Sequence, residues 1–174
     1  MAGQVNPLDQ LAIKNVIARY CEALDTKIFN LLDQVFVSDV KASYPFRPEM
    51  KGVDTIKDAI ASRWVVCEDF HAYFDHSRLG PIRTHHDLTT QTIVFSQDGK
   101  TANSVTYFIG NHFGQGPHEG KLLSAYGQYV DELVCQDADG DFEGVFGASG
   151  KWRIRQRTVL FTQRIGDEKI MSEF

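Results

Sequence analysis

The chain has 174 residues, of which 43% are hydrophobic and 24% charged, and its formal net charge is −5. This length suits one domain with a buried core, and the composition excludes a disordered or collagen-like chain. The sequence contains no stripe of basic residues. This argues against nucleic acid as a partner, because its binding depends on clustered Lys and Arg.

The cysteines, Cys21, Cys67 and Cys135, are odd in number and widely spaced. No Cys-x-x-Cys or Cys/His ligand spacing is present, so we expect neither a disulfide framework nor a zinc site. The N-terminus lacks a basic segment followed by an apolar one, and no apolar run approaches the length of a membrane span. We therefore expect a cytoplasmic protein with reduced thiols and no membrane partner.

The first predicted element is a helix. Asn6 followed by Pro7 is typical of a helix start, with Asn as the N-cap and Pro in the first turn. Apolar residues then recur at intervals of three and four from Leu8 to Leu24, which predicts a helix of about five turns with one apolar face. Asp25 interrupts that pattern, so we expect the helix to end there.

The remaining elements follow in chain order: a short helix over 28–36, a strand over 40–46 that Pro45 and Pro48 stop, an amphipathic helix over 52–66, and strands over 83–95, 101–113, 120–135 and 151–165. The Asp-Gly pair at 98–99 is a strong hairpin signal between two of these strands. Segment 137–150 lacks the spacing of an EF-hand calcium loop, so we expect a hairpin loop and no metal ion there. Helices first and long antiparallel strands afterwards predict an α+β fold, in which a curved sheet wraps around the helices and leaves an internal pocket.

Three segments carry a pattern typical of one family: "VIARYCEALDTKIFNLLDQVFVSDVKASYP" (16–45), "GVDTIKDAI" (52–60) and "GQYVDELV…GKWRIRQRTV" (127–159). Together with the order of elements, they resemble the SnoaL-like branch of the NTF2-like superfamily, a cone-shaped α+β fold. The resemblance implies a single SnoaL-like domain over 1–174. It says less about the reaction, because this fold hosts cyclases, dehydratases, isomerases, dehydrochlorinases and binding modules.

The polar positions look most like those of scytalone dehydratase-like enzymes, which use no cofactor. The resemblance implies site residues at Asp25, where the first helix ends, and at Tyr44 on the next short strand. It also implies His86, from the Thr-x-His pattern in "RTHH", and His112, from "FIGNHF". We therefore expect a cofactor-free site with no metal.

Two positions depart from that pattern. Leu24 stands where scytalone dehydratase-like enzymes carry a tyrosine, and Gly127 stands where they carry an asparagine. Bile-acid dehydratase-like enzymes instead place a tyrosine five residues before the aspartate, which matches Tyr20. The resemblance therefore adds Tyr20 to the candidate site residues.

Physical reasoning about the same residues leads to a related expectation. A carboxylate at the C-terminal end of a helix, such as Asp25, gains nothing from the helix dipole. A histidine is a suitable partner, because the carboxylate fixes its tautomer and raises its basicity. The imidazole then serves as a general base near neutral pH.

Strand alternation separates the two adjacent histidines, because successive side chains point to opposite faces. The two expected sets are His86, Leu88, Thr90, Thr92 and Val94 on one face, and His85, Asp87, Thr89, Gln91, Ile93 and Phe95 on the other. Apolar content does not decide between them, and the preference for His86 rests partly on the family pattern. Both can instead be ordinary strand-start histidines, His112 a loop-edge residue, and the tyrosines packing residues.

The leading hypothesis is a dehydratase, a lyase acting on a small apolar carbonyl compound of polyketide, aromatic or terpenoid type, as in secondary metabolism. His86, held by Asp25, removes a proton α to the carbonyl; His112 or a tyrosine protonates the leaving hydroxyl. An isomerase or cyclase using the same dyad is the alternative, and a non-catalytic small-molecule-binding module is another. We also expect a homo-oligomer, a dimer or trimer formed through the exposed sheet face.

Overall fold

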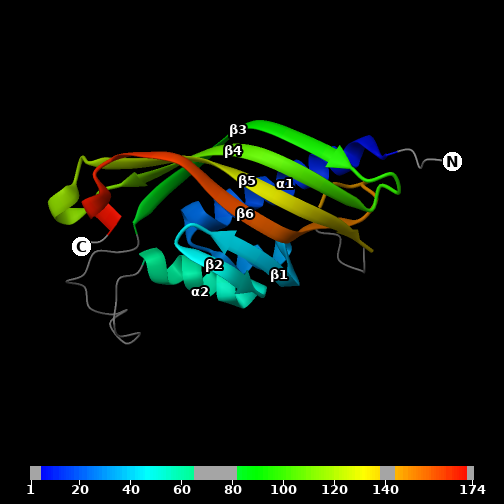
Figure 1. Ribbon diagram of the computed structural model, residues 1–174, viewed down its shortest axis with the longest axis horizontal. Coiled ribbons are helices and arrows are strands. Elements are labelled where there is room, and N and C mark those ends of the chain that lie inside the picture. Colours follow the sequence, from blue (N-terminus) through cyan, green and yellow to red (C-terminus); the bar gives the residue numbers. More distant parts are fainter. Residues whose placement is uncertain (1–4, 65–81, 138–143, 172–174) are drawn as a thin grey trace.

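A six-stranded sheet curves around the first helix in the computed structural model, which describes residues 5–64, 82–137 and 144–171 (Figure 1). The strands are β1 (Phe36–Tyr44), β2 (Arg47–Lys51), β3 (Arg83–Phe95), β4 (Thr101–Phe113), β5 (Leu122–Gln136) and β6 (Lys151–Gly166). The helices are α1 (Pro7–Thr26) and α2 (Val53–Trp64), with 3-10 turns η1 (Phe29–Gln34), η3 (Gly116–His118) and η4 (Glu168–Met171).

The strand order is β2-β1-β6-β5-β4-β3. The pair β1–β6 is parallel and the other neighbouring pairs are antiparallel, so the sheet is mixed. Helix α1 lies across β3–β6, and α2 lies beside β1 and β2 (Figure 1). The predicted α+β fold, with a curved sheet around N-terminal helices, is confirmed.

The first helix begins and ends as its sequence predicts. The Asn6 side chain accepts a hydrogen bond from the Leu8 N–H at 3.1 Å, and Pro7 opens the first turn. The helix continues through Thr26, and Lys27 follows in the left-handed conformation with φ 64°. Asp25 therefore lies in the last turn, where the chain leaves the helix.

The segment after α1 differs from the prediction. The helix predicted over 28–36 is only the short 3-10 turn η1 (Phe29–Gln34), and β1 begins at Phe36 rather than at residue 40. The backbone already joins the sheet at Val35, whose carbonyl accepts a hydrogen bond of 2.9 Å from the Ile154 N–H. Such pairing with a distant strand overrides the local apolar spacing.

Strand β2 was not expected from the sequence, because Pro48 lies within it. Proline has no N–H to donate, which excludes it from the middle of a sheet. Strand β2 is an edge strand and pairs with β1 alone. An edge position tolerates the proline. The predicted strand ends at Tyr44, just before Pro45, but the further strand that contains Pro48 was not predicted.

Strand β3 contains a register shift that changes which residues share a face. His86 pairs with Gly110 and Leu88 with Phe108, but the next pair is Gln91 with Thr106. This β-bulge inserts an extra residue and reverses the alternation beyond it. The inner set is His86, Leu88, Gln91, Ile93 and Phe95, so the predicted grouping of Thr90, Thr92 and Val94 with His86 was wrong.

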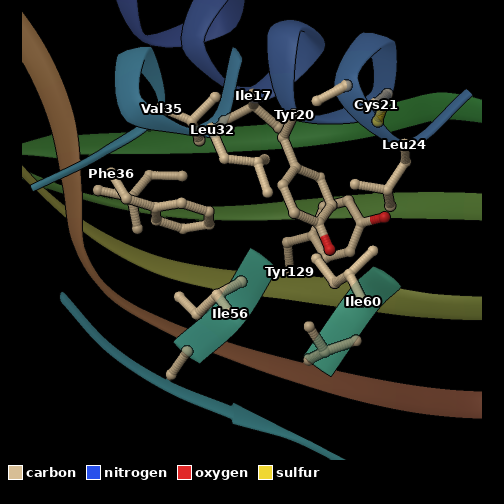
Figure 2. Packing of buried hydrophobic residues seen from close by; sticks show 14 of the residues in the cluster. Ile17, Tyr20, Cys21, Leu24, Leu32, Val35, Phe36, Ile56, Ile60 and Tyr129 are labelled. Carbon is tan, nitrogen blue, oxygen red and sulfur yellow. The ribbon is translucent and has the colours of Figure 1, made fainter. Parts of the chain in front are cut away.

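The hydrophobic core lies between the inner face of the sheet and the two helices (Figure 2). Its fully buried members come from elements far apart in the sequence: Ile13, Ile17, Leu32, Ile56, Leu133, Trp152 and Ile154. The outer face of the sheet is different, because several large apolar side chains are exposed there: Tyr107, Tyr126, Val130, Leu160 and Ile165. No helix within the described ranges has both the length and the apolar character needed to cross a membrane.

Candidate active site

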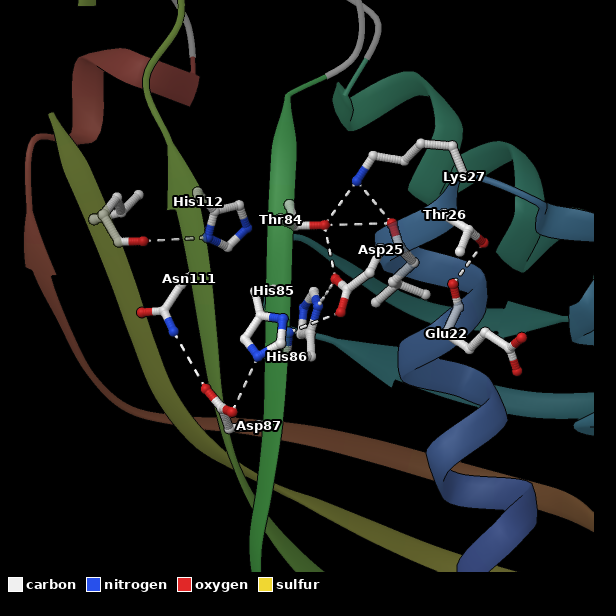
Figure 3. Close-up of polar contacts among 12 residues, drawn as sticks. Glu22, Asp25, Thr26, Lys27, Thr84, His85, His86, Asp87, Asn111 and His112 are labelled. Atoms are coloured by element: carbon white, nitrogen blue, oxygen red, sulfur yellow. Dashed lines mark hydrogen bonds and ion pairs between the residues drawn. The ribbon is translucent and has the colours of Figure 1, made fainter. Parts of the chain in front are cut away.

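The last turn of α1 brings the Asp25 carboxylate against the start of β3 (Figure 3). Asp25 Oδ1 lies 2.7 Å from His86 Nδ1 and accepts a hydrogen bond of 2.9 Å from Thr84 Oγ1. Asp25 Oδ2 accepts a further bond of 2.9 Å from the His86 backbone N–H. Both the main chain and the ring of His86 are therefore tied to one carboxylate.

These contacts determine the tautomer of His86. An ionised carboxylate only accepts hydrogen bonds, so Nδ1 carries the proton and Nε2 of the neutral ring carries the lone pair. The His86 side chain is 6% exposed. A Cβ at Gly110 would lie 3.1 Å from His86 Nε2, so the basic nitrogen lies directly above this glycine on the pocket side of the sheet.

Asp25 remains ionised although it is partly buried. Burial by itself raises the pKa of a carboxyl group. Hydrogen bonds from His86 and Thr84, together with the positive charge of the His86 ring when it is protonated, outweigh burial, so the pKa of Asp25 lies below its usual value. A charged carboxylate beside Nδ1 stabilises the imidazolium that forms when Nε2 takes a proton.

Lys27 belongs to this cluster, and the sequence analysis missed it. Its Nζ donates to the Leu24 carbonyl and to Thr84 Oγ1, each at 2.7 Å. Burial lowers the pKa of Lys27 to about 8, although the charge of Asp25 opposes the change. The one signal in the sequence is its place two residues after an aspartate that ends a helix.

His85 and His86 face opposite sides of the sheet (Figure 3). The His85 side chain is 63% exposed, and its Nε2 lies 3.2 Å from Asp87 on the outer face. His86 faces the pocket and α1. The two neighbours therefore meet different surroundings, as strand alternation requires.

His112 also faces the pocket. Its ring centroid lies 6.2 Å from that of His86, and the two ring planes are inclined by 73°. Its Nδ1 lies 3.4 Å from the Leu123 carbonyl on the neighbouring strand. His112 is the next-to-last residue of β4, and its side chain is buried.

Tyr20 and Tyr44 form a pair of buried phenols in the pocket. Their hydroxyl oxygens lie 3.0 Å apart and share a hydrogen bond. Burial raises the pKa of both groups, so both are neutral near pH 7. Because one proton is used between the two oxygens, the other remains for a ligand.

An ion pair that the sequence analysis did not anticipate lies behind these tyrosines. Arg157 Nε and Nη2 donate to the two carboxylate oxygens of Asp131, each at 2.7 Å, and both side chains are 0% exposed. The guanidinium carbon lies 4.2 Å from the ring centroid of Tyr20 and 4.4 Å from that of Tyr129. This geometry depends on which strands pair, and no local signal in the sequence reveals it.

His86, His112, Tyr20 and Tyr44 line one pocket on the inner face of the sheet. Its lining residues are Tyr20, Leu24, Tyr44, Phe46, Ile60, His86, Phe108, Gly110, His112, Ala125, Tyr129, Val159, Phe161 and Arg164. The walls are mainly apolar, and the polar groups are the imidazoles, the phenols and the guanidinium of Arg164, an arrangement that suits a small organic ligand. In the parts of the chain that the structure describes, no three His, Cys, Asp or Glu side chains are grouped to hold a metal ion.

Comparisons with known proteins agree with this fold. The family model of the SnoaL-like domain matches residues 7–158. No curated protein matches the chain.

Solved structures resemble the chain over most of its length. A scytalone dehydratase-like protein from Novosphingobium aromaticivorans has 21% identity and a TM-score of 0.63, over 92% of this chain and 88% of that one. The hexachlorocyclohexane dehydrochlorinase LinA-type3 from Novosphingobium barchaimii has 13% identity and a TM-score of 0.64, over 92% and 90%. The Kfla4162 protein from Kribbella flavida has 17% identity and a TM-score of 0.64, over 90% and 93%. At these identities the likeness concerns the fold.

Proposed function

The chain belongs to the SnoaL-like domain family, and we propose that it is a dehydratase that acts on a small apolar carbonyl compound through Asp25 and His86. The observation that carries this proposal is the bond of 2.7 Å between Asp25 and His86 Nδ1 at the wall of an apolar pocket. It leaves the basic Nε2 facing the space above Gly110. The reaction needs no cofactor, because each step is a proton transfer or the departure of water.

In the proposed reaction, His86 Nε2 removes a proton from the carbon next to the substrate carbonyl. The electrons of the broken C–H bond form an enolate, whose oxygen accepts a hydrogen bond from the Tyr20–Tyr44 pair. The C–O bond at the neighbouring carbon then breaks, and His112 or a tyrosine gives its proton to the departing hydroxyl. The products are water and a carbonyl compound with a new C=C bond.

Asp25 acts on this reaction through His86. Its negative charge stabilises the imidazolium formed in the first step, and its two oxygens hold the ring in one orientation. Thr84 donates to the same carboxylate and limits its rotation. Asp25 and Thr84 are therefore positioning residues for the base.

The proposal is tested with 3-hydroxy-1-tetralone, a flat β-hydroxy ketone that loses water to give fluorescent 1-naphthol. His86→Ala and Asp25→Asn are each expected to lower turnover by about 10²–10⁴-fold, the usual contribution of a positioned general base. His85→Ala is the matched control, since this neighbour faces the outer surface and is expected to leave turnover unchanged. Equal activity of His86→Ala and the wild type would overturn the proposal.

The same experiment separates the alternatives. An isomerase or cyclase shares the enolate step, so it would exchange the α-protons of 1-tetralone for deuterium in D₂O without releasing water from the hydroxy ketone. A binding module would do neither, and substitution of His86 would change only affinity. Exchange and water loss that both depend on His86 favour the dehydratase.

A homo-oligomer and a cytoplasmic location stay predictions. The exposed apolar side chains on the outer face, among them Tyr126 and Leu160, are the surface on which we expect a second copy to pack. Sedimentation velocity tests this, and Tyr126→Lys is expected to shift a dimer or trimer toward the monomer. A monomeric wild type would contradict it.

A further inference from the structure

Arg164 lies on the inner face of β6, where it lines the pocket that holds His86. Its Nη1 pairs with Glu168 Oε2 in η4 at 2.8 Å. The Arg164 side chain is 27% exposed and that of Glu168 is 57% exposed, so the pair is in contact with solvent as well as with the pocket. Such a solvated pair is weak and exchangeable.

Arg164 and His86 occupy the two ends of one row across the sheet. His86 pairs with Gly110, Gly110 with Ala125, and Ala125 with Arg164. Residues that pair directly on neighbouring strands point to the same face. Three strand spacings separate the ends of the row, so the two Cα atoms lie roughly 14 Å apart along the sheet.

The two middle residues of this row, Gly110 and Ala125, are small and leave space above the sheet. Gly110 has no side chain and Ala125 has a single methyl group. The next row on one side, in contrast, contains the large rings of Phe108 and Phe161. The row on the other side contains His112. The result is a trough with aromatic and imidazole walls, which suits a flat ring system lying from His86 toward Arg164.

The charge of the pocket favours an anion at its Arg164 end. Among the described residues that line it there is no Asp or Glu, and Arg164 is the one Lys or Arg. The counter-charge of Arg164 is Glu168, which is outside the lining and is the more exposed of the two side chains. A guanidinium binds a carboxylate through paired hydrogen bonds, a geometry that Glu168 already uses in part.

We propose that Arg164 is the anchor for a carboxylate group of the substrate, and that the substrate class is a flat apolar carbonyl compound bearing an acid at the end remote from the reacting carbon. The inference rests on the proposed function in placing that reacting carbon at His86. On substrate binding, the ligand carboxylate replaces Glu168 at the guanidinium. Arg164 thereby sets both the orientation of the ligand and the preference for acids.

Two probes of equal shape test the anchor: 2-naphthoate, which is ionised at pH 7.5, and the neutral 2-naphthamide. Isothermal titration calorimetry on the wild type is expected to give about 10-fold or tighter binding of the naphthoate, as for a charge-assisted pair. Arg164→Met is expected to abolish that preference and leave naphthamide affinity within about 2-fold. Arg164→Lys is expected to keep part of the preference, and Glu168→Gln to increase it, because the competing carboxylate is gone.

Arg155→Met is the matched control. Arg155 lies on the same strand and also pairs with a glutamate, Glu132 at 3.1 Å, but is exposed and absent from the pocket lining. This variant is expected to bind both probes as the wild type does. Circular dichroism and thermal unfolding show that each variant is folded.

Several results would overturn the anchor: equal affinity of the wild type for both probes, no binding of either, or an equal effect of Arg164→Met on both. The dyad is judged separately, since Asp25→Asn is expected to lose turnover of 3-hydroxy-1-tetralone and keep its preference for naphthoate. A wild type that turns over 3-hydroxy-1-tetralone but binds naphthoate and naphthamide equally would reject Arg164 as the anchor and leave the dehydratase proposal standing.

Discussion

Two aspartates meet basic partners on the inner face of the sheet, and their surroundings differ. Asp25 contacts His86 at 2.7 Å, with the side chains 22% and 6% exposed. Asp131 contacts Arg157 at the same distance, and both side chains are 0% exposed. The first pair borders the pocket, whereas the second is enclosed among the rings of Tyr20 and Tyr129.

The difference decides what each pair can do. Burial works to lower the pKa of Arg157, but the charge of Asp131 and its hydrogen bonds raise it well above the usual value, so this pair stays charged. His86 has an imidazole at the pocket wall, and the lone pair on its Nε2 is able to accept a proton from a ligand. A dry pair without a proton-accepting nitrogen suits a structural role, whereas a pair at a pocket wall that includes an imidazole suits the proton transfer that we propose.

The largest expected effect comes from breaking the enclosed pair. Asp131→Ala leaves the Arg157 guanidinium buried without its counter-charge, so we expect a loss of about 3–5 kcal/mol in the free energy of unfolding. Urea denaturation measures it. A loss of less than about 1 kcal/mol would show that water reaches Arg157 in the variant.

The control for this experiment removes both charges. In Asp131→Leu combined with Arg157→Met, no charge is left buried, and apolar groups of similar length fill the site. We expect this double variant to recover most of the lost stability, since apolar replacements of buried pairs are often neutral or stabilising.

Lys27, in the partly exposed cluster around Asp25, is expected to make stability depend on pH, whereas the buried Asp131–Arg157 pair is not. Lys27 has its pKa lowered by burial from 10.5 to about 8, so between these values the unfolded chain binds more protons than the folded protein and stability rises with pH. The measured rise is expected to be well below the roughly 3 kcal/mol that the full shift implies by linkage, because Lys27 is partly exposed and solvent screens its charge. It is expected to be absent in Lys27→Met, as measured by urea denaturation across this range. Tyrosines and cysteines titrate in both proteins, so their contribution drops out when the free energy of unfolding of Lys27→Met is subtracted from that of the wild type. A difference that does not change with pH would contradict the expectation.

The lowered pKa of Asp25 is expected to make stability depend on pH in the acidic range. Its pKa is lowered in the folded protein, so its contribution to stability is present above the ordinary carboxyl pKa and is lost as the pH falls below about 4. Asp25→Asn is expected to cost about 1–2 kcal/mol at pH 7, as for hydrogen bonds to a charged group. Denaturation at pH 3 and pH 7 checks this, because the difference from the wild type is expected to shrink at pH 3.

Local sequence signals accounted for much of the fold. The bounds of β3 and β4, Arg83–Phe95 and Thr101–Phe113, match the predicted strands, since an Asp-Gly turn and alternating side chains are local features. The bulge between Leu88 and Gln91 was not foreseen, because it arises from the pairing of β3 with β4. Strand β2 was not predicted for a similar reason, because a sheet tolerates Pro48 only where the strand lies at its edge.

The sequence predicted those candidate site residues whose side-chain type by itself indicates acid–base chemistry. Asp25 and His86 stood out as a carboxylate ending a helix and an imidazole opening a strand, with the family resemblance deciding between His85 and His86. Arg157 and Arg164 were not foreseen, because their roles depend on which strands lie next to β6. The sequence shows which residue types are present, but it does not show which distant strands pair and therefore which of these residues meet.

The smallest expected effect is that of Gly110→Ala, which is expected to change turnover without lowering the free energy of unfolding. A Cβ at Gly110 would lie 3.1 Å from His86 Nε2 and Cδ2, so Gly110→Ala must displace the ring by a few tenths of an ångström. We expect turnover of 3-hydroxy-1-tetralone to fall about 10-fold, because proton transfer depends on near-contact geometry. The free energy of unfolding is expected to stay equal or rise slightly, since alanine is less costly than glycine in a strand. Unchanged turnover would mean that the ring of His86 moves without consequence, and would remove the argument that Gly110 positions the base.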